Sequence, residues 1–342
     1  MRTDALQKFS LGMFSIAGSR PFAGMMMSDK VLALHAINQH ANESDSKLIG
    51  CDTIRDLLAD WPHNFPILNE AAVAIAGSAS DLNPLGTELM ALMVEVAELQ
   101  IHAPLQDPGQ ILMARANYRR HIVELSLRMG RGAGETEAER RADLEALVER
   151  KATEGDPFFW VKTSSAITGP YDTVQIPEAT QKADWEVELA LVIGRPARNV
   201  SVEQALDYVA GYCIANDLSA RDLLVRDEFG PAQDWLTAKC APQFLPLGPY
   251  IVPAAYVGDP NKLSLSLKHN GKLMQDSCTD DMIHNVQTLV AYASRVVQLS
   301  PGDIISTGSP AGNGMEFDVY LRSGDVVEAT VEGLGVQINR FS

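Results

Sequence analysis

Residues 184–194 have the sequence Asp-Trp-Glu-Val-Glu-Leu-Ala-Leu-Val-Ile-Gly, in which two acidic side chains precede an uninterrupted apolar run. Successive side chains of a strand point to opposite faces, so Glu186 and Glu188 share one face and Val187 and Leu189 share the other. The apolar run predicts a strand buried on both faces. Two carboxylates beside a buried strand lie near the interior, where one takes up a proton unless a cation lies between them.

A third acidic residue, Asp217, ends a similar apolar segment, Gly-Tyr-Cys-Ile-Ala-Asn-Asp, at residues 211–217. Three carboxylates with no histidine or cysteine nearby in the sequence form an oxygen-only set. Such a set suits Mg²⁺, Mn²⁺ or Ca²⁺ and does not suit zinc. The Glu-x-Glu pattern alone also fits a strand whose outer face is wet, so both interpretations remain open at this point.

The chain from Phe158 onward is rich in predicted strands. Residues 263–269 alternate apolar and polar side chains, meet Asn270-Gly271 and resume as a second strand, which predicts a hairpin with a type I′ turn. Helices interrupt these strands without a regular strand–helix–strand alternation. The pattern therefore predicts an α+β, mainly β fold and not a doubly wound parallel sheet.

A chain of 342 residues is long enough for about two domains. Residues 1–105 are predicted to form a small α/β N-terminal domain, with a helix expected over 86–99. Residues 106–342 are predicted to form a second, larger domain. Residues 131–154 are half charged and predict a helical insertion, either a solvated surface helix or a lid over a neighbouring site.

The charge balance excludes several classes of partner. The chain carries 28 Lys and Arg against 44 Asp and Glu, a net charge of −16. This composition argues against binding to nucleic acid and against binding to anionic membrane surfaces, because both require a cationic protein surface.

No apolar run is long enough to span a membrane, and the first residues lack the pattern of a secretion signal. Four scattered cysteines predict neither a disulfide framework nor a zinc site. We expect a cytoplasmic protein.

Several segments resemble the fumarylacetoacetate hydrolase family, in the family's order along the chain. They lie at residues 184–194, 211–222, 246–249, 270–275, 299–312 and 323–325, and the resemblance covers about residues 110 to 341. The resemblance implies a mixed β-sandwich roll, and many relatives carry a small N-terminal domain. It also implies that Glu186, Glu188 and Asp217 hold a divalent ion, Mg²⁺ or Mn²⁺, with Ca²⁺ as a further option.

The same resemblance assigns roles to further residues. His121, in the segment Asn117-Tyr-Arg-Arg-His-Ile-Val-Glu124, is the expected general base. Glu124, three residues later, is expected on the same side of a helical turn, where it would orient the imidazole. Lys239 is the expected electrostatic stabiliser of an enolate. The resemblance implies that four more residues contact substrate: Lys162, Arg221, Ser309 and Tyr118. For Arg221 a structural salt bridge, and for Tyr118 a packed aromatic ring, are the alternatives.

One position departs from the family's pattern. Leu224 stands where relatives often carry a glutamine that holds an oxyanion, and Gln233 is a candidate replacement.

The leading prediction is a metal-dependent hydrolase that cleaves a carbon–carbon bond of a 2,4-dioxo acid. The alternatives are a decarboxylase, isomerase or dehydratase acting on a 2-oxo acid, and a non-catalytic binding protein. The expected substrate is a small anionic oxo acid, and the resemblance implies a homodimer.

Overall fold

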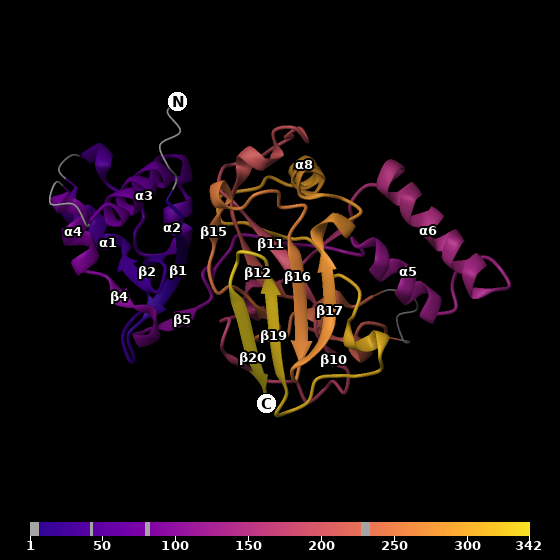
Figure 1. Ribbon diagram of the computed structural model, residues 1–342. Coiled ribbons are helices and arrows are strands. Elements are labelled where there is room, and N and C mark those ends of the chain that lie inside the picture. The colour runs from indigo at the N-terminus through magenta and orange to yellow at the C-terminus, as the bar shows by residue number, and fades with distance from the viewer. Residues whose placement is uncertain (1–6, 42–43, 79–82, 227–232) are drawn as a thin grey trace.

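The computed structural model describes residues 7–41, 44–78, 83–226 and 233–342 (Figure 1). Its C-terminal part, from β6 onward, is a sandwich of a six-stranded and a five-stranded sheet, with helices at the edges, and two short two-stranded ladders complete it. This arrangement confirms the predicted α+β, mainly β fold. The ladders pair β10 (Ala183–Asp184) with β13 (Ser219–Ala220), and β14 (Leu245–Pro246) with β8 (Ile167–Thr168).

The six-stranded sheet carries the acidic residues at its centre. Its strand order is β15 (Val252–Pro253), β12 (Val209–Asn216), β11 (Val187–Ile193), β18 (Ile304–Ser306), β6 (Ile111–Ala114) and β7 (Phe159–Val161). Strand β11 runs antiparallel to both β12 and β18, and β18 runs parallel to β6. Because β11 is flanked on both edges, its backbone groups are paired within the sheet.

The five-stranded sheet covers one face of the six-stranded sheet. Its strands, in order, are β17 (Lys272–Cys278), β16 (Ser264–His269), β19 (Val326–Val331), β20 (Val336–Phe341) and β9 (Thr173–Val174). The hairpin between β16 and β17 turns at Asn270 and Gly271, whose φ values are 50° and 79°. Positive φ at both central residues is the mark of a type I′ turn, so the predicted hairpin is confirmed.

Strand β11 is buried on both faces, as the apolar run predicts. Leu189, Leu191 and Ile193 belong to the hydrophobic core that also contains buried residues of β16 and β19. Ala190 and Val192 belong to a second core that also contains buried side chains of the N-terminal segment. The two cores explain why the strand alternates between two sets of apolar neighbours and exposes neither face.

The N-terminal segment forms an antiparallel sheet packed with helices. The strand order is β4 (Val94–Glu95), β3 (Lys30–Ala33), β2 (Phe22–Met27), β1 (Ser10–Ser15) and β5 (Gln100–His102). The helices are α1 (Leu34–His40), α2 (Ile54–Leu58), α3 (Trp61–Ala76) and α4 (Pro84–Ala91). The helix predicted over 86–99 is wrong in its second half, because α4 ends at Ala91 and β4 pairs with the edge of β3. The boundary predicted at residue 105 stays a prediction.

A pair of helices lies at the end of the molecule opposite the N-terminal sheet (Figure 1). These are α5 (Arg119–Arg128) and α6 (Glu137–Glu154). The other described α-helices of the C-terminal part are α7 (Trp235–Lys239) and α8 (Val286–Val296). Helix α6 begins with a capping box in which Thr136 and Glu139 satisfy each other's backbone N–H groups, and this confirms the predicted helix. Its buried Leu144 and Val148 pack with Ile122 and Val123 of α5.

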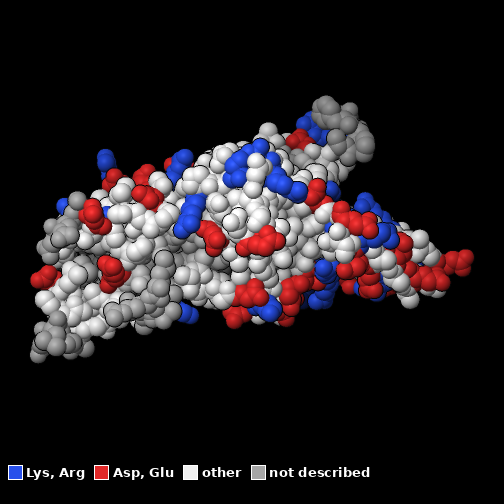
Figure 2. All heavy atoms as spheres, turned by 90° about the horizontal axis from the view of Figure 1, so that it is seen from above, with Lys and Arg blue, Asp and Glu red and all other residues white. Residues whose placement is uncertain are grey.

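Charged side chains of both signs are interleaved where α6 lies, at the right of Figure 2. This mixture is typical of a solvated helix face. Among the described residues, no helix combines the length and the hydropathy that crossing a membrane requires.

Candidate active site

Strand pairing brings the three predicted metal ligands together. Glu188 lies on β11, Glu186 lies just before it, and Asp217 directly follows β12. Because β11 and β12 are antiparallel, the start of one meets the end of the other, and the Asp217 N–H donates to the Glu186 carbonyl at 2.9 Å. All three side chains are buried, and one carboxylate oxygen from each lies within 4.8 Å of the others.

Three cationic side chains surround this carboxylate cluster. The Nζ of Lys239, at the end of α7, donates to Glu186 Oε2 at 2.5 Å and to Asp217 Oδ2 at 2.6 Å. Lys162 Nζ donates to Asp217 Oδ1 at 2.6 Å. Arg221 donates to Glu186 and to Asp184. The structure thus places Lys239, Lys162 and Arg221 at the predicted site, and the salt-bridge alternative for Arg221 is the contact observed.

Glu188 is the one carboxylate of the cluster that no cation in the described residues contacts. Its Oε2 accepts hydrogen bonds from the Ser306 hydroxyl and, at 2.9 Å, from the Gly308 N–H. Burial, followed by the nearby charges of Asp217 and Glu186, raises the pKa of Glu188 well above its usual value.

The pKa of Glu186 is shifted in the opposite direction. Burial acts to raise its pKa, but Lys239 and Arg221 outweigh that effect and hold the pKa well below its usual value. Two neighbouring carboxylates are therefore pushed in opposite directions by what contacts them. A buried oxygen-only cluster with one carboxylate lacking a cation fits a divalent ion, which would neutralise Glu188 without protonation.

The carboxylate cluster lines a cavity of about 360 Å³. A volume of this size is at the small end of ligand-binding sites. Of the other predicted residues, His121, Arg221, Lys239 and Ser309 line the cavity, and so do Leu224 and Gln233. The cavity walls also include two aromatic side chains, Trp160 and Trp235, which stack at 5.3 Å between ring centroids. The sequence motifs therefore converge on one cavity.

The predicted partnership between His121 and Glu124 is wrong. His121 Nδ1 lies 2.9 Å from Glu316 Oε1, and both side chains are largely buried. Glu124 instead accepts two hydrogen bonds from Arg141 of α6, at 2.9 and 3.3 Å. The prediction failed because a spacing of three residues puts Glu124 beside His121 on the helix, whereas the imidazole points across to the 308–317 loop.

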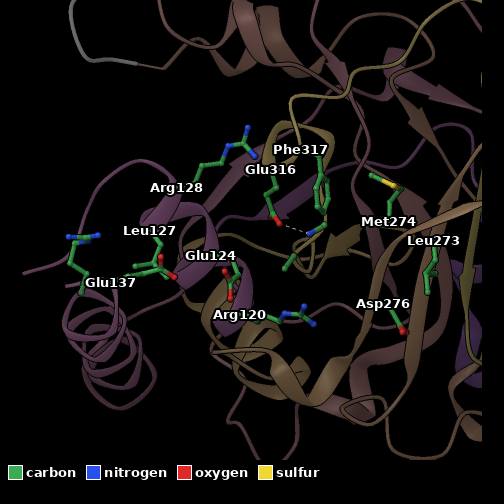
Figure 3. A pocket seen from close by; sticks show the side chains of 13 residues that line it. Arg120, Glu124, Leu127, Arg128, Glu137, Leu273, Met274, Asp276, Glu316 and Phe317 are labelled. Atoms are coloured by element: carbon green, nitrogen blue, oxygen red, sulfur yellow. Dashed lines mark hydrogen bonds between the residues drawn. The ribbon is translucent and has the colours of Figure 1, made fainter.

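Glu316 is held in place by a second contact. Its Oε2 accepts the Gly312 N–H at 2.9 Å, the interaction drawn as a dashed line in Figure 3. Glu316 also lines a neighbouring cavity of about 660 Å³, between α5 and β17. His121 lines the smaller cavity and Glu316 the larger one, so their hydrogen bond joins the two. The contact between Glu316 and His121 could not be predicted from the sequence, because 195 residues separate them along the chain.

Two residues predicted to contact substrate, Tyr118 and Lys162, do not line the carboxylate cavity. Tyr118 is fully buried in the hydrophobic core and does not line the carboxylate cavity, so its packed-aromatic alternative is correct. Lys162 is also fully buried and reaches the site only through Asp217. Ser309 does line the cavity, and its hydroxyl accepts a hydrogen bond from the Gln275 amide at 2.9 Å. The role of Ser309 stays a prediction.

The helical insertion contributes one residue to the carboxylate cavity. Arg131, in the turn between α5 and α6, lines it, while Glu137 and Arg140 line the larger cavity. No described residue of α6 itself lines the smaller cavity. The alternative that 131–154 forms a lid stays a prediction.

Comparisons with known proteins agree on one family. Residues 110–342 match the family model described as fumarylacetoacetate (FAA) hydrolase C-terminal. The chain is 32% identical over 321 residues to a protein named oxaloacetate tautomerase fahd2, mitochondrial, from Xenopus laevis, a match covering 90% of each chain.

Two solved structures are also similar. One is a 5-carboxymethyl-2-hydroxymuconate delta-isomerase from Mycobacterium smegmatis, 33% identical, with a TM-score of 0.57 over 73% of this chain and 84% of that one. The other is a maleylpyruvate hydrolase from Sphingobium sp. SYK-6, described in complex with manganese(II) ion and pyruvate. It is 24% identical, with a TM-score of 0.67 over 97% and 98% of the two chains, a likeness that shows the fold.

Proposed function

The chain belongs to the fumarylacetoacetate hydrolase family, and we propose that it interconverts the keto and enol forms of a small 2-oxo acid in a metal-dependent reaction. The observation that carries this proposal is the cavity itself, in which a buried carboxylate cluster and one histidine base face the same small volume. The relatives above that are at least 30% identical are named as a tautomerase and an isomerase, which favours proton transfer over bond cleavage.

Glu186, Glu188 and Asp217 would hold the metal ion, and Mg²⁺ or Mn²⁺ suits their oxygen ligands. When bound, such an ion supplies a Lewis acid that stabilises negative charge on the ketone oxygen of the substrate. Lys239 adds a buried positive charge beside the same carboxylates. The interior of the cavity is therefore suited to an anionic oxo acid, although the chain as a whole carries a charge of −16.

His121 is the proposed general base. With Nδ1 bonded to Glu316, its Nε2 is the nitrogen available to take a proton from the carbon next to the ketone. The C–H bond breaks and its electron pair forms the new C=C bond, while the π pair of the C=O bond moves to the ketone oxygen. His121 then delivers the proton to that oxygen to give the enol. Glu316 is a positioning residue, because it fixes the ring orientation and stabilises the imidazolium that forms.

The test measures the rate of enol-to-keto conversion of oxaloacetate by ultraviolet absorbance, with and without added MgCl₂ or MnCl₂. We expect the purified chain to accelerate the conversion when metal is present, and His121→Ala to remove the acceleration. A wild-type protein that binds metal but leaves the rate at its uncatalysed value would contradict the proposal.

Hydrolysis of an acylpyruvate is the second candidate function. The carboxylate–histidine pair supports it, because the same base could activate an attacking water. Leu224 counts against it, although Gln233 lines the cavity and could donate to an oxyanion in place of the family's glutamine. Incubation with acetylpyruvate and product analysis by NMR distinguishes the two functions, since only hydrolysis releases acetate and pyruvate.

We propose two further properties of the chain. Homodimerisation follows from the family resemblance, and the mass in solution, measured by light scattering, tests it. The cytoplasmic location expected from the sequence also stays a proposal, because the Xenopus relative is named as mitochondrial.

A further inference from the structure

Two arginines at the opening of the carboxylate cavity have no carboxylate partner among the described residues. Arg115 directly follows β6, and Arg131 lies in the turn between α5 and α6. Both line the cavity, and both are exposed to solvent. We call Arg115 and Arg131 the rim arginines. They differ from Arg221, whose guanidinium is neutralised by Asp184 and Glu186.

Aromatic rings fix the position of Arg115 without using its hydrogen-bond donors. Its guanidinium carbon lies 5.5 Å from the ring centroid of Phe158 and 5.4 Å from that of Trp235. Trp235 stacks on Trp160, and Lys239 Nζ lies 5.6 Å from the Trp160 ring. A cation over a ring face keeps its N–H groups available. The tryptophan pair therefore separates a deep cation, Lys239, from an outer cation, Arg115.

The backbone that presents Arg115 is also in an unusual conformation. Ala116 has a φ of 52°, a value that alanine rarely adopts. The next residue, Asn117, is buried and locks the segment, since its side-chain amide donates to the carbonyls of His284 and Thr307. Strain of this kind persists where the surrounding structure holds it, and it is concentrated at binding sites.

The two rim arginines repel each other. Burial of Arg115, followed by the positive charge of Arg131, lowers the pKa of Arg115. An anion bound between them would relieve this repulsion, and a guanidinium matches a carboxylate in shape and in donor spacing.

We propose that the rim arginines bind a second carboxylate of the substrate, at the end remote from its 2-oxo acid group, and so select oxo-dicarboxylates. This inference rests on the proposed function, which places the 2-oxo acid end of the substrate at Lys239 and the carboxylate cluster. The small volume of the cavity, about 360 Å³, limits the substrate to a short molecule whose ends reach both groups.

The experiment compares oxaloacetate with its 4-methyl ester, which has the same skeleton but lacks the remote charge. The variants are Arg115→Met, which keeps an apolar stem against the rings, Arg115→Lys, which keeps the charge, and Arg131→Ala. We expect Arg115→Met and Arg131→Ala to lose about 10- to 100-fold in kcat/KM for oxaloacetate, chiefly through KM. In the same variants, kcat/KM for the ester should change less than about threefold. Arg115→Lys should retain part of the preference for the acid over the ester.

Arg128→Ala is the matched control, because Arg128 lies on α5 but lines the neighbouring cavity. Arg128→Ala should leave kcat/KM for both oxaloacetate and its ester unchanged. Equal losses for the acid and the ester in the rim variants would show a structural role and overturn the proposal. Unchanged kinetics for oxaloacetate would overturn it as well.

A binding measurement separates this inference from the proposed function. Tryptophan fluorescence reports on the cavity through Trp160 and Trp235, and it does not require turnover. If the wild-type protein turns over neither compound, the proposed function fails. The rim arginines are then supported if the acid binds more tightly than the ester and the variants abolish that difference, and they are refuted if the two compounds bind equally.

Discussion

Glu316 is the residue on which the chemistry of His121 depends. Replacement by glutamine keeps the size of the side chain but removes the charge that stabilises an imidazolium. We expect Glu316→Gln to lower kcat by about 10² or more, in the range of general acid–base contributions. Steady-state kinetics and a metal titration should show lost turnover with metal affinity retained.

Glu124→Gln is the matched comparison for that experiment. Glu124 is held by Arg141, and an ion pair this exposed contributes little to stability. We expect kcat to stay within about twofold of wild type and the melting temperature to fall slightly. A larger loss of activity in Glu124→Gln than in Glu316→Gln would show that the sequence-based assignment of the base's partner was correct after all.

Glu188 has an unfavourable position in the metal-free protein, because it is buried without a contacting cation. We expect Glu188→Gln to melt at or above the wild-type temperature in EDTA, since the substitution removes a like-charge contact. With excess MgCl₂ or MnCl₂ the wild type should gain stability, about 2.7 kcal/mol at one hundred times the dissociation constant, and the variant should gain much less.

The exposed carboxylate of Glu203 provides the control for this measurement. Glu203→Gln should keep the full metal-dependent shift in a thermal melt. If Glu188→Gln shows the same shift as Glu203→Gln, Glu188 is not a metal ligand.

At the scale of elements, α6 is attached by a small apolar cluster rather than by its many charges. Leu144 is 3% exposed and packs with α5, whereas Leu147, on the same helix, is 36% exposed. We expect Leu144→Ala to cost about 2–5 kcal/mol in the local stability of α6, and Leu147→Ala to cost far less. Hydrogen exchange of the amides of residues 137–154 measures both, and equal effects would contradict this account of the packing.

The whole molecule shares hydrophobic cores across the predicted domain boundary. Buried side chains of β1, α2 and α3 belong to the same cluster as Ala190 and Val192 of β11. Leu11 of β1 also exchanges two backbone hydrogen bonds with Ile251, at 2.9 and 2.8 Å. The N-terminal segment therefore covers one face of the six-stranded sheet.

A truncated chain of residues 106–342 tests this dependence. Removing the N-terminal segment exposes apolar side chains of β11 and its neighbours, so we expect a lower melting temperature and aggregation of the fragment. A fragment that melts cooperatively near the temperature of the full chain would instead establish an independent domain.

Sequence periodicity was reliable where one element's own neighbours decide its structure. The β16–β17 hairpin, the buried β11 strand and the α6 helix were all predictable, because turn chemistry, apolar runs and capping residues act locally. The helix expected over 86–99 failed in its second half for the opposite reason. Residues Val94–Glu95 have a helical pattern of apolar neighbours, yet they pair with the edge of a sheet formed by residues far away.

The mainly β fold and the three carboxylates could be predicted from the amino-acid sequence, because strand alternation and an acid at the end of an apolar run are local patterns. Which groups meet across long separations in the chain became clear from the folded structure. It joined His121 to Glu316 instead of Glu124, paired Arg221 with Asp184 and Glu186, and left Arg115 and Arg131 without a described acidic partner at the cavity. The physical reason is that electrostatic pairing depends on distance in space, and sequence spacing specifies that distance only within a single helix or strand.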